Sequence, residues 1–271
     1  VIQAVSLYSA VNSVFISLVN SVFFLAGLYL CKAENGRKAV YWVIMLSLSA
    51  LLLFGILNLL GFFHYKDAVL YSGTNNMRIT SSLQYPNTYA ALLIGMITAS
   101  AIMLQTAKKV QFWFHAALLF PAVLSFILTQ SRGALLIFPI VIIVCGIFLP
   151  FMNQIRMYLY IGFAFAYSLP FTGYFSNIGV RTLNGGSVDA AGLLLFLLLG
   201  AVHGLLLYGA ERFIFQRKSF VDKVENFSKG KPGFLLSASV AGAVVALGAA
   251  GLLALTRLSF LLPDTLRTRI A

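Results

Sequence analysis

The chain has 271 residues, of which 60% are hydrophobic and only 10% are charged. Soluble domains usually carry about a quarter charged residues, so a soluble globular fold is excluded. The mean hydropathy of +0.93 and the recurring long apolar runs predict an all-α fold, a polytopic bundle of transmembrane helices. The formal net charge of +12 does not indicate a nucleic-acid partner, because the basic residues lie in short connections between apolar runs.

We expect a single transmembrane domain over residues 1–271, with eight apolar runs that form membrane helices. These runs are 4–30, 39–63, 87–106, 113–130, 134–151, 157–170, 189–209 and 234–256. The chain starts without a methionine and ends in a polar stretch. We therefore expect it to be part of a longer protein, in which a large external loop and further helices follow residue 271.

The basic residues divide unevenly between alternate connections, which predicts the orientation of the bundle. One side carries 12 of the 19 Lys and Arg residues, mostly in the connections around residues 32–38, 108–109 and 211–231. Cytoplasmic loops are enriched in Lys and Arg, so this side is expected to face the cytoplasm and membrane lipid head groups. Both ends of the chain are then expected on the outer side.

Arg132 lies in the segment TQSRGALLIF, between two long apolar runs with almost no loop around it. A guanidinium at the bilayer centre costs about 3 kcal/mol on insertion scales, so we expect Arg132 at the outer ends of these runs. Its planar fork can bind two phosphate oxygens, each charge-assisted bond contributing about 1.5 to 3 kcal/mol. Gly133 would let a ligand approach closely, and Ser131 can cap the following helix. Alternatively, Arg132 only extends its side chain to the membrane surface.

Arg78 lies on the same side, in the segment MRITSSLQYPNTYAALL, shortly before a Pro86-Asn87 pair that opens a helix. The free amide groups at a helix start, with Arg78 nearby, form an anion site. On this interpretation Arg78 and Arg132 converge, and Asn87 and Ser131 take part in binding. The alternative is that Pro86 and Asn87 only mark the beginning of a helix.

The segments YPNTYAALL and TQSRGALL resemble the O-antigen ligase and O-antigen polymerase family, by motif over residues 75–150 and elsewhere by hydropathy. The resemblance implies a metal-independent glycosyltransferase of the bacterial cytoplasmic membrane, with no cofactor. Such enzymes move a glycan from undecaprenyl diphosphate to an acceptor glycan, lipid or protein on the outer side. The resemblance also implies that Arg132 holds the diphosphate. Arg267 and Arg269 would then begin a large external loop that supplies an essential histidine.

The histidine of that loop is expected beyond residue 271, so the chain on its own is expected to bind the lipid carrier weakly and to be inactive. His64, His115 and His203 fit packing or interfacial positions better, and His64 is the best placed of them to reach a substrate. No cluster of His, Asp or Glu has the spacing of metal ligands, so we expect no metal site.

Two other functions remain open. A flippase for lipid-linked oligosaccharides, or another secondary transporter, would place polar residues along a path through both leaflets, whereas the charges here are one-sided. A peptidoglycan glycosyltransferase of the shape, elongation, division and sporulation class would need an essential outer carboxylate. Asp67 and Asp189 are its candidates.

Overall fold

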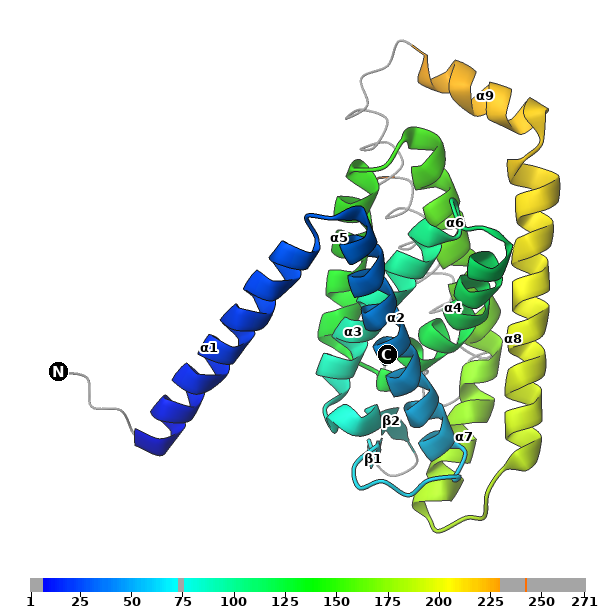
Figure 1. The fold of residues 1–271 in the computed structure, drawn as a ribbon. Coiled ribbons are helices and arrows are strands. Elements are labelled where there is room, and N and C mark those ends of the chain that lie inside the picture. Colours follow the sequence, from blue (N-terminus) through cyan, green and yellow to red (C-terminus); the bar gives the residue numbers. More distant parts are fainter. Residues whose placement is uncertain (1–6, 73–75, 230–241, 243–271) are drawn as a thin grey trace. The chain divides into compact units, whose positions relative to one another are not determined.

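The computed structural model describes residues 7–72, 76–229 and 242, and this part of the chain is mostly helical (Figure 1). It forms two compact units that divide between Leu48 and Ser49. The first unit contains α1 (Leu7–Leu30) and the first half of α2 (Glu34–Leu59). An exposed ion pair of 2.6 Å joins Glu34 and Lys38, one turn apart at the beginning of α2.

The second unit contains the remaining helices and a small sheet. After α2 come strands β1 (Val69–Tyr71) and β2 (Met77–Ile79), then α3 (Pro86–Met103), α4 (Lys109–Thr129), α5 (Arg132–Ile147), α6 (Phe151–Ser168), α7 (Thr172–Leu183), α8 (Ala190–Ala210) and α9 (Lys218–Ser228). A π-helix, Glu211–Phe215, continues α8.

Five helices in the described part are long and apolar enough to cross a membrane: Val11–Leu30, Glu34–Leu59, Pro86–Met103, Lys109–Thr129 and Ala190–Phe215. The surfaces of α5 and α8 carry exposed large apolar side chains, such as Leu136 (75% exposed) and Leu194 (70% exposed). Such continuous apolar surface is a feature of helices that face lipid. The fold therefore indicates a membrane-spanning protein.

The number of spanning helices stays a prediction. The expected run 157–170 falls in α6, which is not one of the five long apolar helices, and α5 is apolar but shorter. The expected run 234–256 lies outside the described residues.

Helix α4 is central in the second unit because it packs against α3, α6 and α8. Aromatic rings fill the space between these helices. Phe120 of α4 is fully buried, and its ring centroid lies 5.4 Å from that of Tyr167 on α6 and 5.8 Å from that of Phe196 on α8. Burial of rings of this size contributes strongly to the stability of a helical core.

The connection from α2 to α3 is ordered, although an irregular loop is expected there from sequence. Strands β1 and β2 form an antiparallel hairpin in which Leu70 is opposite Arg78. Met77 and Ile79 are fully buried, since β2 packs against α4 and α7. Helix α7 likewise forms inside a segment that is expected to be a loop. The all-α expectation thus holds in its coarse form, with a small sheet added.

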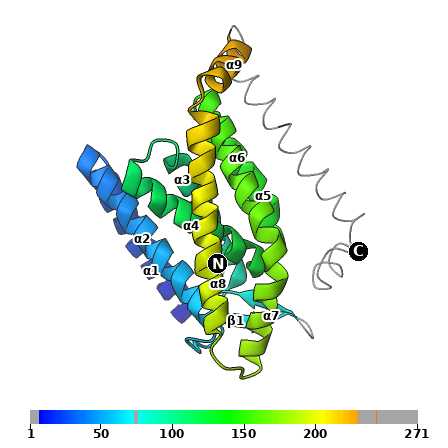
Figure 2. The same ribbon diagram turned by 90° about the vertical axis from the view of Figure 1, so that its right-hand side faces the viewer.

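The second unit has two ends, between which its long helices run (Figure 2). One end contains β1 and β2, the starts of α3 and α5, and the α7–α8 connection, and we call it the hairpin end. Two hydrogen bonds join the last turn of α7 and the α7–α8 connection to the end of α2 and the residue after it. Thr182 Oγ1 donates to Leu59 O at 3.0 Å, and Asp189 N donates to Leu60 O at 2.9 Å. The opposite end holds the start of α6, the π-helix and α9 (Figures 1 and 2).

Candidate anion-binding site

Helices α4 and α5 are separated by a sharp turn of two residues at the hairpin end. Gln130 ends α4 in the left-handed conformation, with φ at 51°. Its side-chain amide donates to Asn76 Oδ1 at 2.7 Å, which holds this less common backbone conformation in place. Ser131 then caps α5, because its Oγ accepts a hydrogen bond from Ala134 N at 3.2 Å.

Arg78, on β2, reaches across to this turn. Its Nε donates to Thr129 O at 2.8 Å, and its Nη2 lies 3.5 Å from Gln130 O and 3.4 Å from Asn87 Oδ1. The side chain is half-buried. All three acceptors are neutral, so the hydrogen bonds fix the position of the guanidinium without neutralising its charge.

Asn87 links the starts of α3 and α5. Its Oδ1 accepts from Ser131 Oγ at 2.9 Å, and its Nδ2 donates to Tyr85 Oη at 3.2 Å. Tyr85 precedes α3 in an extended conformation, and Pro86 occupies the first turn. Two helix N-termini, each with a partial positive charge and free amide groups, therefore meet beside Arg78.

Arg132 is the first residue of α5, and its side chain is exposed. Within the described residues it makes no hydrogen bond or ion pair, and neither Arg132 nor Arg78 contacts a carboxylate. The structure thus joins Arg78, Asn87 and Ser131 in one network and places Arg132 directly next to it. This arrangement of cations and helix N-termini can bind an anion with several oxygens.

Arg267 and Arg269, predicted to add charge to this site, lie outside the described residues. In the described ranges, no group of three His, Cys, Asp or Glu side chains is arranged to hold a metal ion.

The three histidines occupy different environments. His115 on α4 is fully buried, with Nδ1 3.4 Å from Ser100 Oγ. His203 on α8 is fully buried among aromatic rings and stacks on Phe163 at 5.4 Å between ring centroids. His64 is exposed at the hairpin end, where it lines a cavity.

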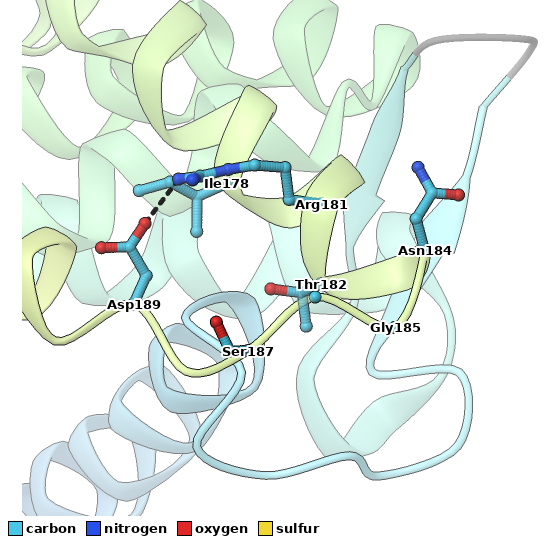
Figure 3. Close-up of a pocket in the computed structure, with 8 residues that line it drawn as sticks. Ile178, Arg181, Thr182, Asn184, Gly185, Ser187 and Asp189 are labelled. Atoms are coloured by element: carbon cyan, nitrogen blue, oxygen red, sulfur yellow. Dashed lines mark hydrogen bonds and ion pairs between the residues drawn. The ribbon is translucent and has the colours of Figure 1, made fainter.

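Asp189 is held by a second arginine that the sequence interpretation did not select. Its Oδ2 pairs with Arg181 Nη2 at 2.5 Å (Figure 3). Its Oδ1 accepts a hydrogen bond from Gly192 N at 2.6 Å, which caps α8. The Asp189 carboxylate thus has two structural partners. The two residues are eight positions apart across a loop, a spacing with no helical or strand pattern to mark it.

The opposite end contains a charged cluster that was also missed. Arg156 on α6 pairs with Glu211 at 3.4 Å and donates to Phe215 O at 3.0 Å. Tyr160 donates a hydrogen bond to the same carboxylate. The Arg156 and Glu211 side chains are only 15% and 14% exposed, so this pair belongs to the packed interior.

The long apolar helices suggest a helical, membrane-spanning protein, and within the described residues the cationic site at the hairpin end has no carboxylate partner. Comparisons of the chain with protein-family models, curated proteins and solved structures found no match.

Proposed function

We propose that the chain is the membrane core of an O-antigen-ligase-like glycosyltransferase, which moves a glycan from undecaprenyl diphosphate to an acceptor hydroxyl. The observation that carries the proposal is the site at the hairpin end. Arg78 is fixed there by neutral acceptors, Arg132 has no partner among the described residues, and two helices begin there. A diphosphate supplies the negative charge and the oxygen acceptors that this site lacks.

In the reaction, the acceptor oxygen forms a bond to C1 of the donor sugar while the bond from C1 to the diphosphate oxygen breaks. The leaving diphosphate takes the electron pair, and the cationic site stabilises the charge that develops on it. The acceptor proton passes to a base, for which we propose a histidine in a loop after residue 271. Attack opposite the leaving group inverts the configuration at C1. Arg267 and Arg269 would add charge on the diphosphate.

We further propose that the hairpin end faces the outer side of a bacterial cytoplasmic membrane. The uneven division of Lys and Arg between alternate connections supports this orientation. Single cysteines at Ser187, in the α7–α8 connection, and at Asn226, on α9, test it in intact cells. An impermeant thiol reagent should modify only the cysteine at 187, and modification of only the one at 226 would reverse the orientation.

The two other functions would use this end of the molecule differently. A peptidoglycan glycosyltransferase needs a free carboxylate near the diphosphate. Asp189 is held by Arg181 and by the start of α8, whereas the Asp67 side chain forms no ion pair within the described residues, so Asp67 is the remaining candidate for this alternative. A transporter needs a polar path through the bundle. In the described part of the second unit, Arg78 lies instead at one end and the Arg156–Glu211 pair at the other.

The test is the Arg132→Lys substitution in the complete protein. Lysine keeps the positive charge but cannot bind two phosphate oxygens with a planar fork, so transfer should fall by about tenfold or more while membrane abundance stays unchanged. Arg212→Lys is the matched control. Arg212 is an exposed arginine at the opposite end that donates to Gln216 at 3.1 Å, and this variant should transfer normally. Wild-type transfer by Arg132→Lys would contradict a diphosphate site at this position.

A further inference from the structure

A cavity of about 300 Å³ lies at the hairpin end, between the segment after α2 and the end of α7. It is lined by Asn58, Phe63, His64, Tyr65, Lys66, Asp67, Val69, Leu70, Tyr71, Thr182 and Leu183. The hairpin connects it to the anion-binding site, because Leu70 in the cavity wall is the strand partner of Arg78. The volume is at the lower limit for ligand sites, about 300 to 1,000 Å³, which suits a small unit such as one sugar ring.

Three aromatic side chains in the wall are about half exposed: Phe63 at 49%, Tyr65 at 49% and Tyr71 at 53%. They are nevertheless held in place. Phe63 stacks on Phe54 with 6.0 Å between ring centroids, and Tyr65 meets the same ring edge-on at 5.5 Å. The Tyr71 hydroxyl donates to Asn184 Oδ1 at 2.7 Å. Fixed aromatic rings that remain exposed can stack against the C–H face of a ligand without a large loss of side-chain entropy.

The segment that carries these rings is itself anchored. Asn58 Oδ1 accepts from Tyr65 N at 2.8 Å, and Asn58 Nδ2 donates to Phe54 O at 2.8 Å. Asp67 has a positive φ of 59°, and its carbonyl accepts a hydrogen bond from Thr80 Oγ1 on the buried side of the hairpin. The wall of the cavity is therefore positioned by the protein before any ligand binds.

The polar groups of the cavity are suited to hydroxyls. In the described chain, the side chains of His64, Lys66 and Asp67 form no hydrogen bond or ion pair with other residues. The carboxylate of Asp67 can accept from two neighbouring hydroxyls, and Lys66 can donate to a third. Because one lysine and one aspartate offset each other, the cavity favours a neutral ligand. The carboxylate would also repel a phosphate, in contrast to the site around Arg78.

From the exposed rings, the partnerless polar groups and the balanced charge, we propose that this cavity is a sugar-binding subsite. It takes one neutral sugar ring of a glycan, stacked on Tyr71 and hydrogen-bonded to Asp67. The assignment of this glycan to the donor or the acceptor rests on the proposed function. The sugar chemistry itself rests on the cavity alone.

Saturation-transfer NMR on the purified chain in lipid nanodiscs tests the subsite, with maltotetraose and chitotetraose as probes at about 5 mM, a concentration suited to weak binding. Detergents with sugar head groups are avoided, because they would occupy the cavity. We expect saturation transfer to the ring C–H protons of at least one probe. In the Tyr71→Ala and Asp67→Asn variants the affinity should fall by about tenfold.

Two further variants separate loss of binding from loss of folding. Tyr174→Ala removes an exposed tyrosine (41%) of α7 that does not line the cavity, and it should bind like the wild type. Tyr71→Phe keeps the ring and loses only the hydroxyl bond to Asn184, so it should retain most of the binding. The proposal is overturned if neither probe shows saturation transfer, or if Tyr71→Ala binds both probes as tightly as the wild type.

The neutral probes carry no phosphate, so their binding should persist in Arg132→Ala. If the sugar probes bind and undecaprenyl diphosphate does not, the proposed function is contradicted and the sugar subsite is supported. If undecaprenyl diphosphate binds and the sugar probes do not, only the sugar subsite is contradicted. A farnesyl-diphosphate-linked N-acetylglucosamine distinguishes the two glycan sources. Displacement of the neutral probe assigns the subsite to the donor, and simultaneous binding of both assigns it to the acceptor.

Discussion

The two ends of the second unit each hold a partly buried arginine, and the two differ in how their charge is compensated. At the opposite end, Arg156 pairs with Glu211, which also accepts a hydrogen bond from Tyr160. At the hairpin end, within the described ranges, Arg78 hydrogen-bonds only to two backbone carbonyls and to the side-chain oxygen of Asn87. Both arginines are thus partly buried, but among the described residues only Arg156 has a counter-ion.

Under the proposed function, this difference separates an arginine that stabilises the fold from one that binds a ligand. Removing a guanidinium from water costs several kcal/mol, and a carboxylate partner offsets most of that cost. Arg156 has this partner within the protein. Arg78 has only neutral acceptors, and the exposed Arg132 beside it adds a second positive charge. An anionic ligand would supply the negative charge for Arg78 at the hairpin end, as Glu211 does for Arg156 at the opposite end.

The largest expected effect on stability is at the opposite end. Arg156→Ala leaves Glu211 buried without a counter-ion, which should lower the free energy of unfolding by about 3 to 5 kcal/mol. Chemical unfolding in detergent, followed by tryptophan fluorescence, measures this change. The double variant Arg156→Met with Glu211→Gln removes both charges and should recover most of the loss. A loss below about 1 kcal/mol in Arg156→Ala would mean that the pair is not structural.

Arg78→Ala should have a smaller effect on stability and a large one on binding. It removes hydrogen bonds to neutral groups, each contributing about 1 kcal/mol, but it also removes an uncompensated charge, so the net loss should be near 1 kcal/mol. Affinity for undecaprenyl diphosphate should fall by about tenfold or more. Arg181→Ala, at the same end, is the control and should bind the lipid normally. If Arg78→Ala and the wild type bound undecaprenyl diphosphate with equal affinity, Arg78 would not take part in binding.

Ser131 allows the structural and electrostatic contributions at the hairpin end to be separated. Ser131→Ala removes the cap of α5 and should destabilise the protein by about 1 kcal/mol. Ser131→Asp keeps an acceptor for the helix start but places a carboxylate beside Arg78. This variant should be more stable than Ser131→Ala and should bind undecaprenyl diphosphate more weakly, as measured by unfolding and by lipid titration. If Ser131→Asp binds the lipid better than Ser131→Ala, charge is not what the site recognises.

The smallest expected effect is that of Arg132→Ala on stability. Arg132 is exposed and forms no ion pair with another described residue, so the free energy of unfolding should change by less than about 0.5 kcal/mol. Thermal unfolding of the purified variant measures this change. A larger loss would show that Arg132 is a structural residue like Arg156.

Much of the helical pattern could be predicted from sequence because lipid-facing helices need long apolar runs. The expected run 87–106 corresponds to α3 (Pro86–Met103), and 113–130 corresponds to α4 (Lys109–Thr129). Strands β1 and β2 could not be predicted, because they are three residues long and become ordered only by packing against α4 and α7. Such short strands carry too few residues for an alternating pattern.

The candidate site, too, could be predicted from sequence only in part. The proximity of Arg78, Asn87 and Ser131 could be predicted, since both helix starts were expected on the same side of the bundle. The partner of Arg156 could not be predicted, because Glu211 is 55 positions away in the chain. Glu211 follows α8, and the length of α8 does not determine how this helix is rotated about its axis. Sequence placed Arg156 in a connection, whereas the structure places it inside α6. The cavity at the end of α7 was missed for a similar reason, because its wall comes from two distant segments.

Lipid binding by the purified chain 1–271 tests the central claim most directly. The chain is titrated with undecaprenyl diphosphate and, in parallel, with undecaprenol, at low ionic strength where electrostatic attraction is least screened. We predict measurable binding of the diphosphate, much weaker binding of the alcohol, and loss of the difference in the double variant Arg78→Ala with Arg132→Ala. We also predict no glycan transfer by this chain alone. Equal affinity for both lipids, or wild-type binding by the double variant, would contradict an anion-binding site at the hairpin end.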